Sequence, residues 1–411
     1  MNGAAGPAWK PRARRFECSA ARLASALRIA ENAALDFLRF TLWPRRGQRL
    51  NRIAVYRIGN VGDTVCALPA LWAVRRAYPA ASLTLVTSPG RRGAPGAAEL
   101  LDGARWLDEI VAYHSEDVAD RGGRHRMLNE LRRREFDAWI ELPVVDTRFR
   151  TQLRNLLVAR ALGPRWAAGW AVGPRSFAAR AQSASRAMPN EVERLLAIVA
   201  RLGIEPLPVK FPLPISQADR SLAGRVVNQA GQGRPLVALA PAAKCESNLW
   251  PAGRFAEVGR RLAASGFAPV VLGGAADTAR CAEIAALIGA PAIDLAGRTT
   301  ILESAAILER CALAICLDSG LQHLAAAVGT RCLSLFAGKG FRGIWHPYGD
   351  LHTVLRKTLE CDSCLLQRCP RGNHCMNLIE TAEVEYWADR MLAGFPAGGF
   401  SGAYTGASAG A

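Results

Sequence analysis

Asp318, Ser319 and Gly320 stand where an apolar segment of strand length, Leu313–Leu317, gives way to an alanine-rich segment with strong helix propensity. A helix that begins here leaves unpaired backbone N–H groups in its first turn, and such groups bind phosphate without a metal ion. His323, one turn into the same helix, is expected to hydrogen-bond to that phosphate. The stretch therefore predicts a nucleotide-diphosphate site. An ordinary strand-to-helix turn capped by Asp or Ser is the alternative interpretation.

A glycine-rich loop, Ile58–Asp63, follows a second apolar segment of strand length, Ile53–Arg57. Gly59 and Gly62 let the backbone turn tightly and let a substrate approach it closely. Asp63 places one carboxylate at the end of the strand, where it could remove a proton from a hydroxyl nucleophile or cap a helix. The loop lacks the glycine pattern of dinucleotide sites and the lysine of phosphate loops, which disfavours an NAD-dependent oxidoreductase.

Three loops in the second half of the chain repeat this arrangement at the ends of predicted strands. Lys244 follows the first of these strands and could neutralise a diphosphate. Gly273 and Gly274, with Asp277 behind them, end the next strand, and the loop Leu295–Thr300 ends the third. Because such loops meet at one edge of a parallel sheet, their recurrence indicates one nucleotide-sugar pocket.

Short apolar segments alternate with helical ones along the chain, which is typical of parallel sheets covered by helices. The predicted strands are Ile53–Arg57, Leu83–Thr87, Ala138–Leu142 and Trp166–Trp170, then Leu236–Leu239, Ala268–Leu272, Ile293–Leu295, Ala312–Leu317 and Cys332–Phe336. We therefore predict an α/β fold of two Rossmann-like parallel-sheet domains that face each other across a cleft. The predicted regions are a basic extension (1–50), a first domain (51–205), a proline-rich linker (206–216), a second domain (217–392) and a disordered Gly/Ala tail (393–411).

The N-terminal extension carries apolar residues at helical spacing, with arginines between them. The prediction is a disordered segment, 1–17, and then a helix over residues 18–43. The apolar positions of this helix are Leu23, Leu27, Ala30, Ala34, Phe37 and Leu38. Such a helix lies on a membrane surface or packs on its own domain, and the sequence leaves both open.

The formal net charge is +17, and it is concentrated in two regions. Residues 1–50 carry ten Lys and Arg and a net charge of +7, and residues 147–190 carry eight Arg and no acidic residue. An anionic membrane or a phosphorylated glycolipid fits this charge better than nucleic acid, because no nucleic-acid-binding module accompanies it. A genome rich in G and C would also raise the Arg content. No apolar run has the length of a membrane span and no secretory signal is evident, so we expect a cytoplasmic protein.

Four of the eleven cysteines are clustered, at positions 361, 364, 369 and 375, and His374 adjoins the last. Thiols at Cys361, Cys364, Cys369 and Cys375 could hold a structural zinc ion. The spacing lacks the two separated Cys-x2-Cys pairs of ordinary zinc sites, so local packing or cross-linking is the alternative. No base is paired with these thiols in the sequence, and we expect no catalytic role for them.

Together these motifs resemble glycosyltransferase family 9, the ADP-heptose:lipopolysaccharide heptosyltransferases. The resemblance rests on Arg57–Pro69, Pro241 with Trp250-Pro251, Gly273-Gly274, Leu295–Gly297, Asp318–Ala327 and the cysteine cluster. It implies a GT-B fold, inversion at the transferred sugar and no obligatory metal. It also implies ADP-heptose as donor, an anionic lipid A-linked core as acceptor, and a peripheral position at the cytoplasmic face of the inner membrane.

The resemblance further implies roles for individual residues. Asp63 is the expected base that activates the acceptor hydroxyl, on the acceptor loop that contains Gly59 and Gly62. The expected donor-binding residues are Lys244 near the phosphates, Asp277 at donor hydroxyls, Asp318 at the sugar, and Ser319, Gly320, Leu321 and His323 at the diphosphate.

Two positions depart from the family pattern. Asn248 stands two residues before Trp250, where members carry Lys or Arg, so Lys244 would have to substitute for that cation. Asp277 is shorter than the Glu that many members have. Two alternatives therefore stay open: a family 9 transferase that uses another nucleotide sugar for O-antigen, capsule or other glycans, and a nucleotide-sugar-binding protein whose catalysis has decayed.

Overall fold

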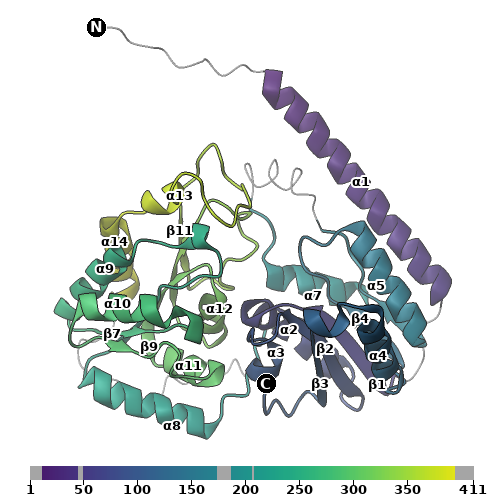
Figure 1. The fold of residues 1–411 in the computed structure, drawn as a ribbon, viewed down its shortest axis with the longest axis horizontal. Helices are drawn as coiled ribbons and strands as arrows, with labels where there is room; N and C mark the ends of the chain where they lie inside the picture. The colour runs from purple at the N-terminus through teal and green to yellow at the C-terminus, as the bar shows by residue number, and fades with distance from the viewer. Residues whose placement is uncertain (1–11, 45–49, 174–186, 206–207, 394–411) are drawn as a thin grey trace.

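The computed structural model describes residues 12–44, 50–173, 187–205 and 208–393 (Figure 1). Its strands form two parallel sheets, one in each half of the chain. The first has the order β3-β2-β1-β4-β5, made of Glu109–His114, Ser82–Gly90, Arg52–Ile58, Ala138–Glu141 and Trp166–Ala168. The second has the order β11-β10-β9-β6-β7-β8, made of Thr353–Arg356, Cys332–Phe336, Cys311–Leu317, Leu236–Ala240, Ala268–Val271 and Ile293–Asp294. The predicted α/β fold of two parallel-sheet domains is confirmed.

All nine predicted strands are present, but two further strands have no counterpart in the prediction. Both β3 and β11 lie at an edge of their sheet. Their residues are mostly half-buried, whereas all seven residues of β9, in the middle of its sheet, are buried. An edge strand with solvent on one side lacks the continuous apolar run by which a central parallel strand is recognised.

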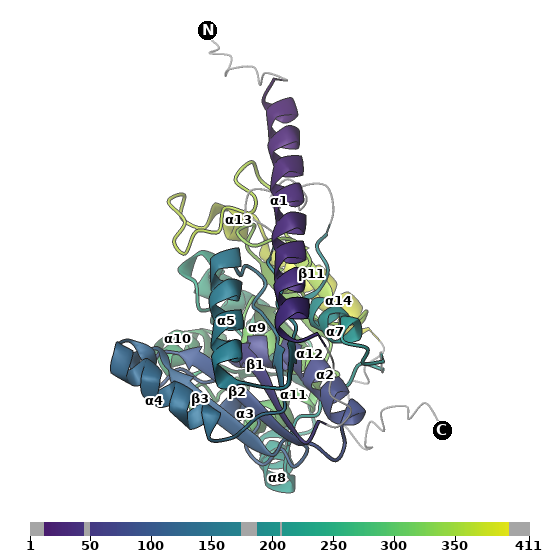
Figure 2. The ribbon, with the colours of Figure 1, turned by 90° about the vertical axis from the view of Figure 1, so that its right-hand side faces the viewer.

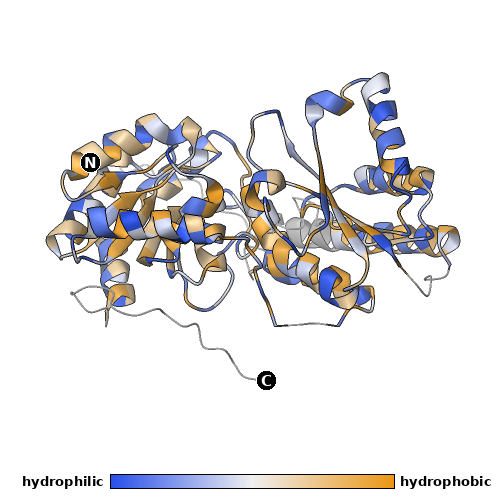
Figure 3. Cartoon of the chain, turned by 90° about the horizontal axis from the view of Figure 1, so that it is seen from below, coloured by the Kyte–Doolittle hydropathy of each residue, from blue (hydrophilic) through white to orange (hydrophobic). Residues whose placement is uncertain are grey.

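Successive residues of each strand face opposite sides of the sheet, and helices cover both sides. On the first sheet, the outer side is covered by α1 (Arg12–Leu42), α4 (Arg121–Arg132) and α5 (Phe149–Leu162), and the inner side by α2 (Val61–Ala77), α3 (Ala97–Leu100) and α7 (Glu191–Arg201). On the second sheet, the outer side is covered by α9 (Ala252–Ala264), α10 (Thr278–Ile288), α13 (His374–Asn377) and α14 (Thr381–Leu392), and the inner side by α8 (Gln217–Val226), α11 (Ile301–Leu308) and α12 (Gly320–Ala327). Figure 3 shows the two domains beside each other, with hydrophobic residues on their strands.

The inner sides of the two domains share one continuous cluster of buried apolar residues. Within it α2, which follows β1, packs against α12, which follows β9. This packing brings the first turns of the two helices together. The carboxyl ends of β1 and β9, where sequence analysis placed the two main motifs, therefore lie at the junction of the domains.

Helix α1 runs along the outer side of the first domain, beside α5 (Figure 2). It begins at Arg12, so the prediction of disorder as far as residue 17 is wrong for its last six residues. Leu35 is buried in the core of the domain, and Trp43, just past the helix, stacks on Trp170 at 5.5 Å between ring centroids. Among the described residues, no helix combines the length and apolar character that crossing a bilayer requires. The predicted tail lies, apart from Ala393, outside the described residues.

A glycine at the end of β5 is required by both backbone conformation and space. Gly169 has φ +106°, and a Cβ there would lie 2.1 Å from the carbonyl oxygen of Glu141. We predict that Gly169→Ala lowers the free energy of unfolding by more than about 2 kcal/mol, because strain and a steric clash add. Gly163, at the end of α5 with φ +79°, has open space around it. Gly163→Ala should therefore cost only about 1 kcal/mol in urea unfolding, and equal losses would contradict the steric argument.

Candidate active site

Asp63 occupies the first turn of α2. The helix is capped by Asn60, and Asp63 is its third residue, with Oδ2 accepting a hydrogen bond from the Asn60 backbone N at 3.0 Å. The predicted alternative, Asp63 as the cap itself, is therefore wrong by three positions. Gly59 is needed beside it, because a Cβ on Gly59 would lie 2.2 Å from Cβ of Asp63.

A buried ion-pair group lies beneath Asp63. Arg57, at the end of β1, places Nη2 3.0 Å from Oε1 of Glu191 and 3.8 Å from Oδ1 of Asp63. Glu191 is fully buried and also pairs with Arg194 at 2.6 Å. Burial raises the pKa of Asp63, and the positive charge of Arg57 together with the Asn60 amide opposes that rise. Sequence analysis missed this group, because its partners lie far apart in the chain.

On the other side of the junction, Asp318 directly follows β9 and Ser319 is the N-cap of α12. The helix begins at Gly320. Asp318 accepts hydrogen bonds from Nδ2 of Asn248 at 3.2 Å and from Nε2 of Gln322 at 3.4 Å. Burial raises the pKa of Asp318 to about 6, against the opposing effect of the Lys339 charge.

Three polar atoms at this end of α12 are buried and have no hydrogen-bond partner among the described residues. They are Oγ of Ser319, Oδ1 of Asn248 and Oε1 of Gln322. Unsatisfied buried polar atoms are costly to a fold, so groups of this kind mark positions where a ligand atom is expected to bind. Asn248 is thus part of the site, although the family pattern has Lys or Arg at this position.

The two helix termini touch each other directly. A Cβ on Gly62 would lie 3.2 Å from Cα of Gly320 and 3.1 Å from Cδ2 of His323. Nδ1 of His323 lies 3.4 Å from Sγ of Cys66, in α2. Burial lowers the pKa of His323 to about 4 and raises that of Cys66, so both groups are neutral at pH 7. When the Cys66 thiol is the donor to Nδ1, the His323 proton lies on Nε2, where it can donate to a ligand.

Lys244 reaches across the junction from the second domain. With the Asn60 side-chain amide donating to the Pro89 carbonyl, Oδ1 of Asn60 accepts from Nζ of Lys244 at 2.9 Å. Asp63 and Asp318 are also close enough that the charge of Asp63 contributes to the raised pKa of Asp318. The structure therefore brings Gly59, Gly62, Asp63, Lys244, Asp318, Ser319, Gly320 and His323 into one group, with Leu321 in the first turn of the same helix.

Asp277 belongs to a different loop of the second sheet. It follows β7, two strands from β9, and its Oδ2 accepts from the backbone N of Gly274 at 3.0 Å. Its expected contact with donor hydroxyls stays a prediction. That expectation rests on the resemblance to the family and on the position of the Asp277 loop directly after a strand. The spacing along the chain does not show how far apart β7 and β9 lie in the sheet.

The four clustered cysteines all belong to the described part of the chain. Cys361 is exposed and the other three are half-buried, and Sγ of Cys375 accepts from the backbone N of Gly338 at 3.3 Å. Across the described residues, no three His, Cys, Asp or Glu side chains are arranged to hold a metal ion. The residues as placed do not form a zinc ligand set, so no step of the chemistry below uses a metal at these thiols.

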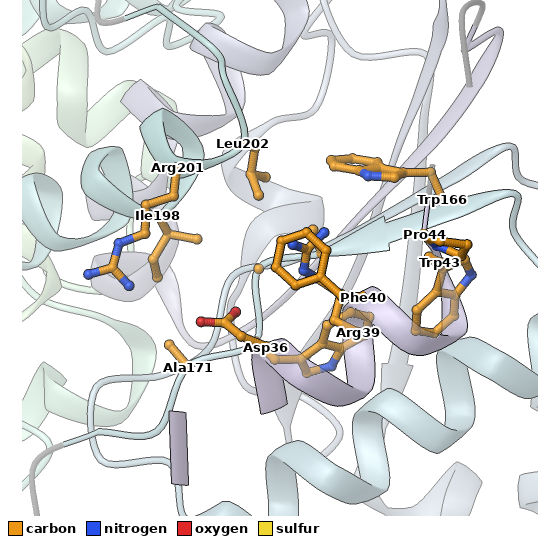
Figure 4. Close-up of a pocket in the computed structure, with 13 residues that line it drawn as sticks. Asp36, Arg39, Phe40, Trp43, Pro44, Trp166, Ala171, Ile198, Arg201 and Leu202 are labelled. Carbon is orange, nitrogen blue, oxygen red and sulfur yellow. The ribbon is translucent and has the colours of Figure 1, made fainter. Parts of the chain in front are cut away.

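A cavity of about 320 Å³ lies apart from the group at the junction (Figure 4). It is bounded by the end of α1, by the segment around β5 and by α7. Figure 4 shows Asp36, Arg39 and Phe40 on one side of it and Arg201 on another. None of the residues that sequence analysis singled out for catalysis lines it.

The buried pair beneath Asp63 should be much more important for stability than an exposed pair on the same strand. We predict that Arg57→Met lowers the free energy of unfolding by about 3 kcal/mol, because it leaves Glu191 short of a partner in the interior. Arg52, five residues earlier in β1, pairs with Glu135 at 3.1 Å on the surface. Arg52→Met should change stability by less than about 1 kcal/mol in the same denaturation experiment. Similar losses in both variants would contradict the importance of the buried pair.

A comparison with known proteins places the chain in a family. The model of glycosyltransferase family 9 (heptosyltransferase) matches residues 124–374. Lipopolysaccharide heptosyltransferase 1 of Pseudomonas aeruginosa is 26% identical over 340 residues, which cover 77% of this chain and 87% of the relative. Lipopolysaccharide heptosyltransferase 3 of Escherichia coli is 31% identical over 164 residues, 39% of this chain and 48% of the relative.

Solved structures share the fold at low identity. A glycosyl transferase family 9 protein of Veillonella parvula superimposes with a TM-score of 0.67 at 19% identity, over 84% of this chain and 99% of that one. The ADP-heptose lipopolysaccharide heptosyltransferase II of E. coli has a TM-score of 0.61 at 21% identity, over 83% of this chain and 98% of that one. The predicted GT-B arrangement is thereby confirmed. Because the family model spans more than half of the 411 residues, this protein belongs to glycosyltransferase family 9 and is a glycosyltransferase.

Proposed function

We propose that this glycosyltransferase moves a heptose from ADP-heptose to a hydroxyl of a lipid A-linked lipopolysaccharide core, with inversion at the transferred sugar. The observation that carries the proposal is the meeting of Asp63, from the first domain, with Asp318 and the first turn of α12, from the second. A base on one wall and an anion-binding helix terminus on the other are what an inverting displacement needs.

The base in this proposal is Asp63. It removes the proton of the acceptor hydroxyl while that oxygen forms a bond to the anomeric carbon of the donor. Its raised pKa makes it a better proton acceptor than an ordinary aspartate, and its hydrogen bond to Asn60 holds the carboxylate in place. Arg57 and Glu191 fix the end of β1 beneath it.

The leaving group in this proposal is held by the second domain. As the bond between the anomeric carbon and the phosphate oxygen breaks, negative charge develops on the departing ADP. The amides of Gly320 and Leu321, the Nε2–H of His323 and the ammonium of Lys244 would stabilise that charge. Asp318 and the free oxygens of Asn248 and Ser319 would contact the sugar or the inner phosphate. These residues need no metal ion for the displacement.

The relatives support the choice of donor and acceptor. Lipopolysaccharide heptosyltransferase 1 of Pseudomonas aeruginosa aligns over 77% of this chain. One structural neighbour of the same family was solved with ADP, and again with a fluorinated ADP-heptose. The family model begins after Asp63, so the role of that residue is supported by its position in the structure and by the first-domain motif.

Asn248 keeps one alternative open, a family 9 transferase with another nucleotide sugar. A neutral amide hydrogen-bonded to Asp318 presents different chemistry from a lysine or arginine, so the sugar or phosphate contact at that point can differ. The same observation speaks against a decayed site, because Asn248 is ordered by Asp318 and Lys244 supplies a cation nearby. We further propose a peripheral position at the cytoplasmic face of the inner membrane. Structural zinc at the cysteine cluster remains a prediction.

Asp63→Asn should fold normally and lose transfer. We expect turnover to fall by roughly 10²-fold or more, because the amide cannot accept the proton, while donor binding stays nearly unchanged. Asp219 is a matched control, since it is the third residue of α8 and accepts from the backbone N of Ser216 at 2.7 Å. Asp219→Asn should leave turnover unchanged. Full turnover in Asp63→Asn would end the assignment of the base.

Titration calorimetry followed by a transfer assay tests the donor and the acceptor. The expected result is tightest binding of ADP-heptose among ADP-, UDP- and GDP-sugars, and transfer to a heptose-deficient lipid A core with the opposite anomeric configuration in the product. Tighter binding of a UDP- or GDP-sugar would show that ADP-heptose is not the donor. Retained configuration would contradict a single displacement assisted by Asp63.

A further inference from the structure

Helix α1 is held to the first domain by one face only. Leu35 is 1% exposed, Asn32 accepts at Oδ1 from the backbone N of Val172 at 2.9 Å, and Trp43 donates to the Pro164 carbonyl at 2.9 Å. These contacts fix which side of the helix faces the protein. The sequence pattern alone is compatible with apolar residues that pack on the domain and with apolar residues that face outward.

Five of the six apolar residues that the sequence singled out are on the outward face, whereas Leu38 packs against the core of the first domain. Leu23, Leu27 and Phe37 are 63%, 42% and 71% exposed. Their spacing, with Ala30 and Ala34 between them, alternates between four and three residues, so they follow one stripe along the helix. Exposed aliphatic and aromatic side chains in one stripe are unusual on a surface that meets water alone.

Two more exposed residues widen this stripe into a face. Ile29 and Phe40 are 66% and 57% exposed, and they stand eleven residues apart, about three turns, on one flank of the stripe. Phe40 also borders the cavity of Figure 4, and the Arg39 guanidinium lies 3.7 Å from its ring centroid. A face of that width is broader than the narrow seam of a two-stranded coiled coil. It matches the shallow, wide apolar surface of a helix that lies in the plane of a membrane interface.

The neighbouring surface is basic. Helix α5 lies beside α1 (Figure 2), and Arg150, Arg154 and Arg160 are exposed on it, together with Leu157. No acidic residue occurs between Thr147 and Asn190. Anionic phosphate headgroups complement such a surface. A second copy of the chain would instead bring two sets of these arginines toward one seam, where like charges repel.

We propose that the outward face of α1 is a membrane-docking surface, with its apolar side chains among the acyl chains of an anionic lipid layer and the arginines of α5 at the phosphates. This goes beyond the transfer reaction, because it identifies the surface by which the enzyme would reach a lipid-linked acceptor. It does not depend on which sugar is transferred.

Vesicle co-sedimentation with the full-length protein tests the proposal. The wild type should bind phosphatidylcholine vesicles that contain phosphatidylglycerol, and should bind less to phosphatidylcholine alone or at high salt. Leu23→Gln/Phe37→Gln should weaken binding by about tenfold or more, because two large apolar groups no longer leave water. Arg150→Gln/Arg160→Gln should lose the preference for anionic lipid while keeping the apolar contribution.

A matched control uses exposed leucines elsewhere. Leu287 and Leu351 belong to the second domain and are 46% and 58% exposed, so Leu287→Gln/Leu351→Gln should bind vesicles as the wild type does. All variants should transfer sugar normally to a water-soluble, deacylated acceptor, so failure of lipid binding and failure of the proposed reaction are separate results. The proposal is overturned if the α1 variant binds vesicles like the wild type, or if light scattering shows a wild-type dimer that this variant splits.

Discussion

Two helix N-termini meet at the centre of this molecule, and the close contact of Gly62 with Gly320 allows them to do so. Each terminus carries partial positive charge from its unpaired amides, so bringing the two together is unfavourable by itself. Asp63 stands in the first turn of α2 and Asp318 directly before α12, and both carboxylates offset that charge. A diphosphate bound at the same point would offset it further. The same geometry thus explains why acidic groups are present there and why an anionic ligand would be attracted.

The support for this contact comes from a buried group of charges in the first domain. Arg57 donates to the Pro143 carbonyl at 3.0 Å as well as to Glu191, and Glu191 is also paired with Arg194. The group therefore joins the end of β1, the segment after β4 and the start of α7. Such pairs contribute less to stability than their Coulomb attraction indicates, because both charges lose water. Their value here lies in fixing three separate segments around Asp63.

The cation expected at the donor side of the proposed site stands at a different position from the one that the family pattern leads us to expect. Asn248 stands at the position that is commonly basic, and it orders Asp318 by a hydrogen bond. Lys244, four residues earlier, contacts Asn60 in the other domain. A lysine that reaches across the junction neutralises a phosphate only when the two domains are together. In the proposed reaction, this contact would link the charge at the donor phosphates to the position of the first domain.

Local sequence patterns are enough to predict the buried strands, the loops at their ends and the resemblance to the family. Central parallel strands such as β9 are apolar throughout, and the motifs after β1 and β9 are local, so neighbouring residues carry the whole signal. The half-exposed strands β3 and β11 escaped because their patterns are mixed. Sequence order also does not show that the loop with Asp277 follows a strand two places away from β9 in the sheet.

The residue pairs that make the site arise from long-range packing. Arg57 with Glu191, Cys66 with His323 and Lys244 with Asn60 are each joined across more than a hundred residues. Each depends on how two helices or two domains pack, which no local pattern records. The orientation of α1 also depends on long-range packing. Its sequence has apolar residues around much of the helix, and the contacts of Leu35 and Trp43 decide that Leu23 and Phe37 face outward.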